Sequence, residues 1–151
     1  MIFREAQPDD IGQIITVRFA VKENTLSDPS LVTAADCEEY LFNRGKGWVC
    51  LENEVVVGFS IIDLKEKNVW ALFVHPDFAE KGIGKTLHGM MLEWYFDQSN
   101  ENIWLGTSPA TRAEQFYRMQ GWQATGVHGK GEIKFEMSFE RFKNKIVAVQ
   151  K

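Results

Sequence analysis

The segment AEKGIGKT, Ala79 to Thr86, combines glycines, lysines and a threonine in the manner of a phosphate-binding loop. Apolar residues at helical spacing follow it, beginning with Ile83 and Leu87, so we expect it to open a helix. A helix N-terminus has unpaired backbone N–H groups and a partial positive charge, which together favour an anion. Gly82 and Gly84 lack side chains and would let a phosphate approach the backbone closely. The segment therefore predicts a phosphate site.

A nucleotide P-loop is the first alternative, because Gly84, Lys85 and Thr86 fit a relaxed form of that pattern, with Ala79 in place of its first glycine. A P-loop directly follows a strand of a parallel sheet. Here three strands joined by short turns precede the segment, which indicates antiparallel connectivity. The dinucleotide fingerprint also fails, because Leu87 stands where its third glycine is required. The pattern thus favours a phosphate-bearing ligand other than ATP or a dinucleotide.

The strands and helices predicted around this loop indicate an α+β fold in a single domain, residues 1–151. We expect a mixed, mostly antiparallel sheet of about seven strands with four helices. The residues after Arg141 show no clear pattern. The predicted strands are 2–6, 48–52, 55–64, 68–74, 102–107, 122–127 and 133–139. The predicted helices are 11–22, 34–44, one whose buried face runs from Ile83 to Trp94, and 108–121.

Several residues suggest how these elements begin and pack. Thr33 and Asp36 form a capping-box pattern, with Val32 and Cys37 placed for a hydrophobic staple. Ser108 and Pro109 suit the start of the helix at 108–121. His88 is expected to face solvent. Four tryptophans fall on strands or their ends and are expected in the core: Trp48, Trp70, Trp104 and Trp122.

Composition narrows the function classes. The chain has 151 residues, 44% of them hydrophobic, and its 21 acidic side chains exceed 17 basic ones, which argues against nucleic acid as a partner. Cys37 and Cys50 have no metal-ligand spacing and the three histidines are scattered, so we expect no metal site. The chain opens without a signal-peptide pattern and has no apolar run of about 20 residues, so we expect a cytoplasmic protein without a membrane partner.

Two segments together resemble the GNAT superfamily of N-acetyltransferases. ALFVHPDFAEKGIGKTLHGMML is similar to the family's acetyl-CoA-binding strand, loop and helix, and TRAEQFYRMQGW is similar to its later helix. Gly82 and Gly84 match the loop signature, whereas Ala79 replaces an Arg or Gln and Glu80 a common Gly. Ala110 stands where many members carry Asn. The predicted order of elements matches the family's fold over nearly the whole chain.

The resemblance implies an acetyltransferase that moves acetyl from acetyl-CoA to a primary amine by direct attack. The loop would hold the pyrophosphate on backbone N–H groups, and the pantetheine arm would pair with the strand before it, in a slot where the sheet splays from strand 102–107. Tyr117 would be the general acid. The implied cofactor-binding residues are Leu72, Phe73, Val74, Ala79, Glu80, Lys81, Gly82, Ile83, Gly84, Lys85, Thr86, Ala110, Phe116 and Tyr117.

Some questions stay open at this level. The general base has three candidates, Asp63, Glu66 and His75, and Asn24 and Asp28 could line an acceptor pocket. A homodimer is compatible with the family. The departures at positions 79 and 110 also leave an alternative, a non-catalytic acyl-CoA sensor or interaction module of the same fold.

Overall fold

A computed structural model describes residues 1–21 and 33–150, and its described strands form one mixed sheet. The strand order is β1-β2-β3-β4-β5-β7-β6, and every neighbouring pair is antiparallel except β4 and β5. The predicted α+β fold class is confirmed. The strands are β1 (Ile2–Glu5), β2 (Gly45–Glu52), β3 (Val55–Asp63), β4 (Asn68–Val74), β5 (Ile103–Thr107), β6 (Gln123–His128) and β7 (Glu132–Met137).

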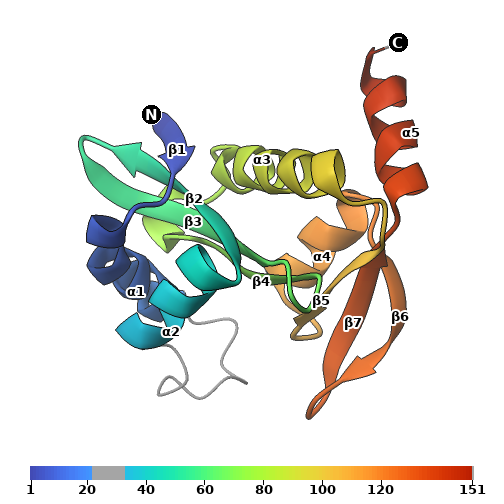
Figure 1. The fold of residues 1–151 in the computed structure, drawn as a ribbon, viewed down its shortest axis with the longest axis horizontal. Coiled ribbons are helices and arrows are strands. Elements are labelled where there is room, and N and C mark those ends of the chain that lie inside the picture. Colours follow the sequence, from blue (N-terminus) through green and yellow to red (C-terminus); the bar gives the residue numbers. More distant parts are fainter. Residues whose placement is uncertain (22–32, 151) are drawn as a thin grey trace.

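Helices cover the two faces of the sheet separately (Figure 1). The face under α1 and α2 buries a cluster that includes Ile14, Phe59 and Ile61. The opposite face packs against α3 and α4 through a larger cluster that includes Leu87 and Phe135. The helices are α1 (Ile11–Ala20), α2 (Ala34–Glu38), α3 (Ile83–Gln98), α4 (Arg112–Met119) and α5 (Phe139–Gln150).

The described residues form five α-helices, one more than predicted, because the tail is helical. The predicted strand 133–139 ends at Met137, and Ser138 Oγ accepts a hydrogen bond from Arg141 N in the first turn of α5. Phe142 then packs its ring 5.0 Å from that of Phe96 on α3. This helix start was hidden in the sequence, because polar Ser138 and apolar Phe139 continue the alternation of polar and apolar residues in β7.

The antiparallel meander β2–β3–β4 is confirmed, and its first turn has a local cause. Asn53 and Glu54 both have positive φ, 51° and 66°, which is the geometry of a type I′ hairpin turn. The helix expected over 34–44 is instead a short α2 followed by a π-helical turn over Glu39–Asn43. The Thr33–Asp36 capping box is present, whereas Val32, Asn24 and Asp28 lie outside the described residues.

The sheet opens between β4 and β5. Their parallel pairing is limited to Asn68 opposite Trp104, and Trp104 N donates to Lys67 O at the same end. No other residue of β4 is paired with a residue of β5. The expected splay at this position is therefore confirmed.

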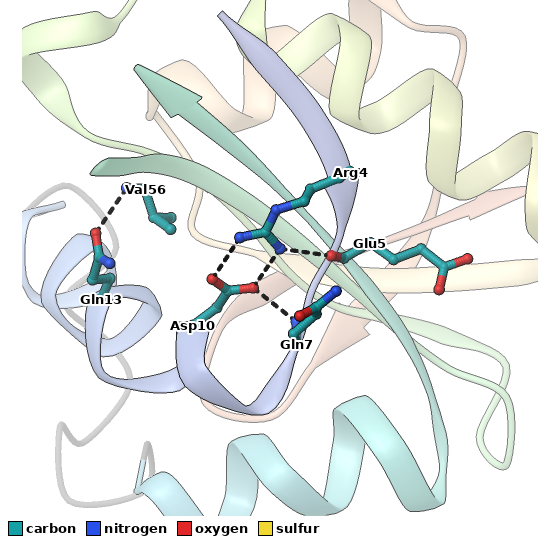
Figure 2. Close-up of polar contacts among 6 residues, drawn as sticks. All are labelled: Arg4, Glu5, Gln7, Asp10, Gln13 and Val56. Carbon is teal, nitrogen blue, oxygen red and sulfur yellow. Dashed lines mark hydrogen bonds and ion pairs between the residues drawn. The ribbon is translucent and has the colours of Figure 1, made fainter. Parts of the chain in front are cut away.

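A polar network fixes the start of the chain against the sheet (Figure 2). Arg4 donates from both terminal nitrogens to the Asp10 carboxylate, at 2.8 and 3.0 Å, and Gln7 N donates to the same group at 2.7 Å. On the next turn, Gln13 Oε1 accepts from Val56 N at 2.9 Å. These bonds join β1, α1 and β3, which places α1 over its face of the sheet.

Replacing Asp10 with asparagine should lower the free energy of unfolding by about 1 kcal/mol at neutral pH, a modest value because Arg4 is partly exposed. The hydrogen bonds from Arg4 lower the pKa of Asp10. The stabilisation is therefore complete above the unfolded pKa near 3.9 and is lost as the pH falls through the lower folded value. Denaturant titrations of both proteins from pH 7 to pH 3 should show the difference narrowing only below about pH 4; a constant difference would contradict this assignment.

Candidate active site

The glycine loop provides a set of unpaired backbone donors. Gly82, at φ 81°, is the N-cap of α3, and Thr86 N and Oγ1 both bond to its carbonyl. Within the described residues, none of the backbone N–H groups of Glu80–Lys85 has a hydrogen-bond acceptor. The side chains of Lys81 and Lys85 add positive charge at the same place. The loop can therefore bind a multivalent anion such as a pyrophosphate.

Next to the loop, one edge of β4 is free. His75 N donates to Val57 O, and the register then makes Phe73 the next residue of β4 that bonds to β3. Because backbone groups alternate in direction along an antiparallel pair, the N–H and C=O groups of Leu72 and Val74 point toward the opening. Trp70 is skipped in the register and forms a β-bulge. Of the three predicted residues, Leu72 and Val74 present backbone groups to the opening, whereas Phe73 bonds to β3.

Gly84 is where three elements meet. A Cβ atom added there would lie 3.7 Å from Val74 Cγ2 and 3.9 Å from Phe116 Cε1. The start of α3, the end of β4 and α4 therefore surround one point, beside the unpaired amides. Of the sequence-predicted residues, Val74, Gly84 and Phe116 are brought together here.

Tyr117 lies behind this point, on the face of the sheet that α3 covers. Its ring contacts those of Phe116, Trp122 and Phe135, and only 6% of the residue is exposed. Burial raises its pKa, so the phenol stays protonated at neutral pH. Within the described residues its hydroxyl makes no hydrogen bond, which leaves the O–H free to donate to a ligand.

The comparisons with known proteins agree with this geometry. The model of the Acetyltransferase (GNAT) family matches residues 13–122. The chain belongs to this family. It is thus an acetyl-CoA-dependent acyltransferase, and the family resemblance stated from the sequence is confirmed.

Solved structures from several organisms share the fold. A PaiA N-acetyltransferase from Thermoplasma acidophilum, solved in complex with coenzyme A, is 17% identical with a TM-score of 0.73, covering 91% of this chain and 98% of that one. A ribosomal-protein-alanine N-acetyltransferase from Brucella melitensis is 18% identical with a TM-score of 0.76, covering 91% and 99%. The smu.2055 structure from Streptococcus mutans UA159 is 14% identical with a TM-score of 0.79, covering 92% and 99%. At such identities the likeness shows the fold alone. No curated protein matches the chain.

Two departures from the GNAT pattern occur at unusual backbone positions. Glu80 and Ala110 both have positive φ, 65° and 60°. Such a conformation costs a residue with a Cβ about 1 kcal/mol or more, whereas glycine and asparagine adopt it readily. Ala110 N donates to Glu114 Oε1 in the turn before α4. The helix itself is capped by Thr111, not by Ser108 as predicted, because Thr111 Oγ1 accepts from Glu114 N.

The prediction that His88 faces solvent is wrong. His88 is 3% exposed on α3, and its Nε2 accepts a 2.9 Å hydrogen bond from Trp122 Nε1. Burial lowers its pKa to about 3, so the imidazole is neutral. This bond ties the segment between α4 and β6 to α3. A signal was present in the sequence, since His88 shares helical spacing with Met91, Leu92 and Tyr95, all fully buried.

The three sequence candidates for the base do not converge on the opening. Asp63 is buried and accepts two hydrogen bonds from Arg44, at 3.2 and 2.6 Å. Glu66 has a largely exposed side chain near the same arginine. His75 Nδ1 accepts from Asp77 N and caps the turn after β4. Asp63 and His75 therefore have structural contacts of their own, and Glu66 is mostly in contact with solvent.

Other features of the described residues do not form a competing site. They contain no group of three or more metal-ligating side chains and no helix able to cross a membrane. Cys37 and Cys50 are buried and unpaired, and burial raises the pKa of Cys37 to about 11. Two open grooves of about 640 and 650 Å³ lie along α3 and α5, where Phe96 and Phe139 line both. Neither includes the glycine loop or β4.

The tryptophans divide into two groups. Trp48 and Trp122 are buried, as predicted. Trp70 and Trp104 are only partly buried and flank the opening from β4 and β5. Trp70 stacks on Tyr40 with ring centroids 4.2 Å apart.

Proposed function

We propose that the protein transfers acetyl from acetyl-CoA to a primary amine by direct attack in a ternary complex. The observation that carries the proposal is the row of unpaired amides from Glu80 to Lys85, set beside the free edge of β4 where the sheet opens. The amide row supplies hydrogen-bond donors for a pyrophosphate, and the free edge of β4 supplies an extended backbone with which a peptide-like arm can pair.

Coenzyme A has both chemical parts. Its pyrophosphate would bind the amides of Glu80–Lys85, with Lys81 and Lys85 adding charge. The pantetheine amides would pair with the backbone of Leu72 and Val74 as an added strand does. Ala79 offers no side-chain contact but leaves the amide row intact. Ala110, in the turn before α4, and Phe116, on α4, would border the cofactor. The coenzyme A in the T. acidophilum structure supports this assignment by likeness of fold.

The arm would enter the opening from the face that carries the loop. The β-bulge at Trp70 leaves backbone N–H groups near the thioester available to stabilise the tetrahedral oxyanion. On the same face as the loop, the protonated phenol of Tyr117 would donate to the sulfur as the C–S bond breaks. A buried phenol is a weak acid, so transfer would accompany bond cleavage and not precede it.

The remaining assignments follow from the sequence. We propose a single domain over residues 1–151 that works in the cytoplasm, with no bound metal and with neither nucleic acid nor a membrane as partner. A homodimer is the assembly proposed for it.

Thermal unfolding with acetyl-CoA, coenzyme A and Mg-ATP, each added separately, tests the cofactor. A ligand at 100 times its Kd stabilises the fold by about 2.7 kcal/mol, which should raise the Tm by about 5–11 °C for a chain of this length. We expect a shift with both coenzyme A species and none with Mg-ATP. Turnover is then assayed with 1,4-diaminobutane, L-lysine, tyramine and an alanine-initiated tripeptide. Binding without turnover of any amine would favour the acyl-CoA sensor instead.

A further inference from the structure

Two polar side chains converge over a glycine on the far side of the opening. A Cβ atom added to Gly106 of β5 would lie 2.9 Å from Glu132 Oε1 and 3.0 Å from His128 Cδ2. The two groups are therefore within about 6 Å of each other. Glu132 and His128 are directly opposite in the β6–β7 ladder, so their side chains leave the same face of the sheet. Only the missing side chain at position 106 allows them to reach over β5.

Strand alternation shows which face this is. Ile103 and Leu105 of β5 lie in the cluster under α3 and α4, so Trp104 and Gly106 face the other way. Trp104 lies beside the same group, with its ring 4.8 Å from that of His128 and 5.2 Å from Lys134 Nζ. The cluster therefore occupies the face opposite to the glycine loop and Tyr117.

The cluster also lies at the level of the reacting centre. Asn68 pairs with Trp104 where β4 and β5 separate. Because the two strands are parallel, counting two residues on from this pair along each strand leads to Trp70 and Gly106. Trp70 is the bulged residue of β4. Glu132 thus reaches over β5 toward the part of the opening where the thioester of an arm bound along Leu72 and Val74 would end.

An acceptor must approach from this face, because α3 and α4 fill the other one. Its ammonium has to lose a proton before the nitrogen can attack. A carboxylate accepts a proton and attracts an ammonium. Glu132 therefore has the chemistry and the place that Asp63, Glu66 and His75 lack.

We infer that Glu132 is the general base of the transferase, an inference that rests on the proposed function. Its carboxylate takes one proton from the acceptor ammonium. The amine nitrogen then bonds to the acetyl carbon and the C–S bond breaks. The second nitrogen proton passes to water as the amide forms, and Tyr117 protonates the sulfur. Tyr117 then regains a proton from water and Glu132 releases its own to water. The net change is thioester and ammonium to amide, thiol and one released proton.

The test compares Glu132→Gln with Glu136→Gln. Glu136 is on the same face of the same strand, but it pairs opposite Trp104, where β4 and β5 are still joined. With the best acceptor of the four-amine panel, E132Q should lower kcat about 100-fold at pH 7.5 with an unchanged KM for acetyl-CoA, and E136Q should lower it less than 2-fold.

The pH dependence distinguishes a base from a structural residue. An alkyl amine loses its proton near pH 10.4, so a base matters less as the pH rises. The deficit of E132Q should shrink by about 10-fold or more between pH 7.5 and pH 10. A deficit that is the same at both pH values would overturn the assignment.

Gly106→Ala provides a second test that leaves both polar groups in place. Its methyl group would displace the ends of Glu132 and His128, so it should lower kcat in the same pH-dependent way without changing the Tm by more than a few degrees. A larger loss in His128→Gln than in E132Q, or equal activity of E132Q and the wild type, would overturn the inference while the proposed function stands. Absence of turnover by the wild type would overturn both.

Discussion

Gly84→Asp should abolish cofactor binding while leaving the fold intact. The new Cβ would make ordinary contacts with Val74 and Phe116, so no neighbour needs to move. A carboxylate in the first turn of α3 stabilises the helix by up to about 1 kcal/mol, because it interacts with the unpaired amides. The same carboxylate would occupy and repel the pyrophosphate site. We expect the Kd for acetyl-CoA to rise at least 100-fold, about 2.7 kcal/mol, when measured by calorimetry.

Gly89→Asp is the matched control for this experiment. Gly89 lies on the same helix, and a Cβ atom added there meets nothing within 4 Å. The variant should keep the wild-type Kd and differ in stability by less than 1 kcal/mol. Loss of binding in both variants would mean that net charge, not the amide row, determines affinity. Wild-type binding in G84D would exclude the loop as the pyrophosphate site.

Tyr117→Phe should lower kcat by about 100-fold, the lower end of the effect of a general acid, with little change in the KM for acetyl-CoA. The hydroxyl makes no hydrogen bond within the described residues, so the substitution removes no contact from the fold. Because burial raises the pKa of Tyr117, the wild-type rate should show no decline from its ionisation up to about pH 10. Steady-state kinetics between pH 7 and pH 10 measure both quantities.

Tyr95→Phe separates catalysis from packing. Tyr95 is also fully buried, and its hydroxyl donates to Asn102 O at 3.3 Å, at the far end of α3 from the loop. Removing that bond should lower the free energy of unfolding by about 1 kcal/mol and leave kcat unchanged. If Y117F retained the wild-type kcat across this pH range, Tyr117 would be a packing residue only.

Local chemistry made part of the site readable from the sequence. Gly82 and Gly84 mark the start of a helix whose first amides are unpaired. This start can be read from the sequence, because the glycine needed at positive φ and the helical pattern that follows it lie within a few residues of each other. The short connection between the predicted strands 48–52 and 55–64 was readable for the same reason, since a two-residue connection between β-branched runs permits few geometries. The family resemblance rests on segments of this local kind.

Three features needed the tertiary structure. His88 was misplaced because its burial depends on Trp122, which lies 34 residues away in the segment between α4 and β6 and donates a hydrogen bond to it. Asp63 looked available as a base until Arg44 was brought against it from the end of the π-helical turn. The helix after Ser138 is held by Phe142 against Phe96, a contact that no pattern within the tail reveals.

The sequence by itself determined the glycine loop that opens α3, the antiparallel meander and the family, because each depends on residues close together in the chain. Only the tertiary structure decided which side chains face the opening between β4 and β5. Glu132 shows why: alternation assigns it to one face of β7, but its position over Gly106 depends on the pairing of β5 with β7, between residues more than 20 positions apart. Strand pairing over such distances is set by the whole sheet, and no single segment encodes it.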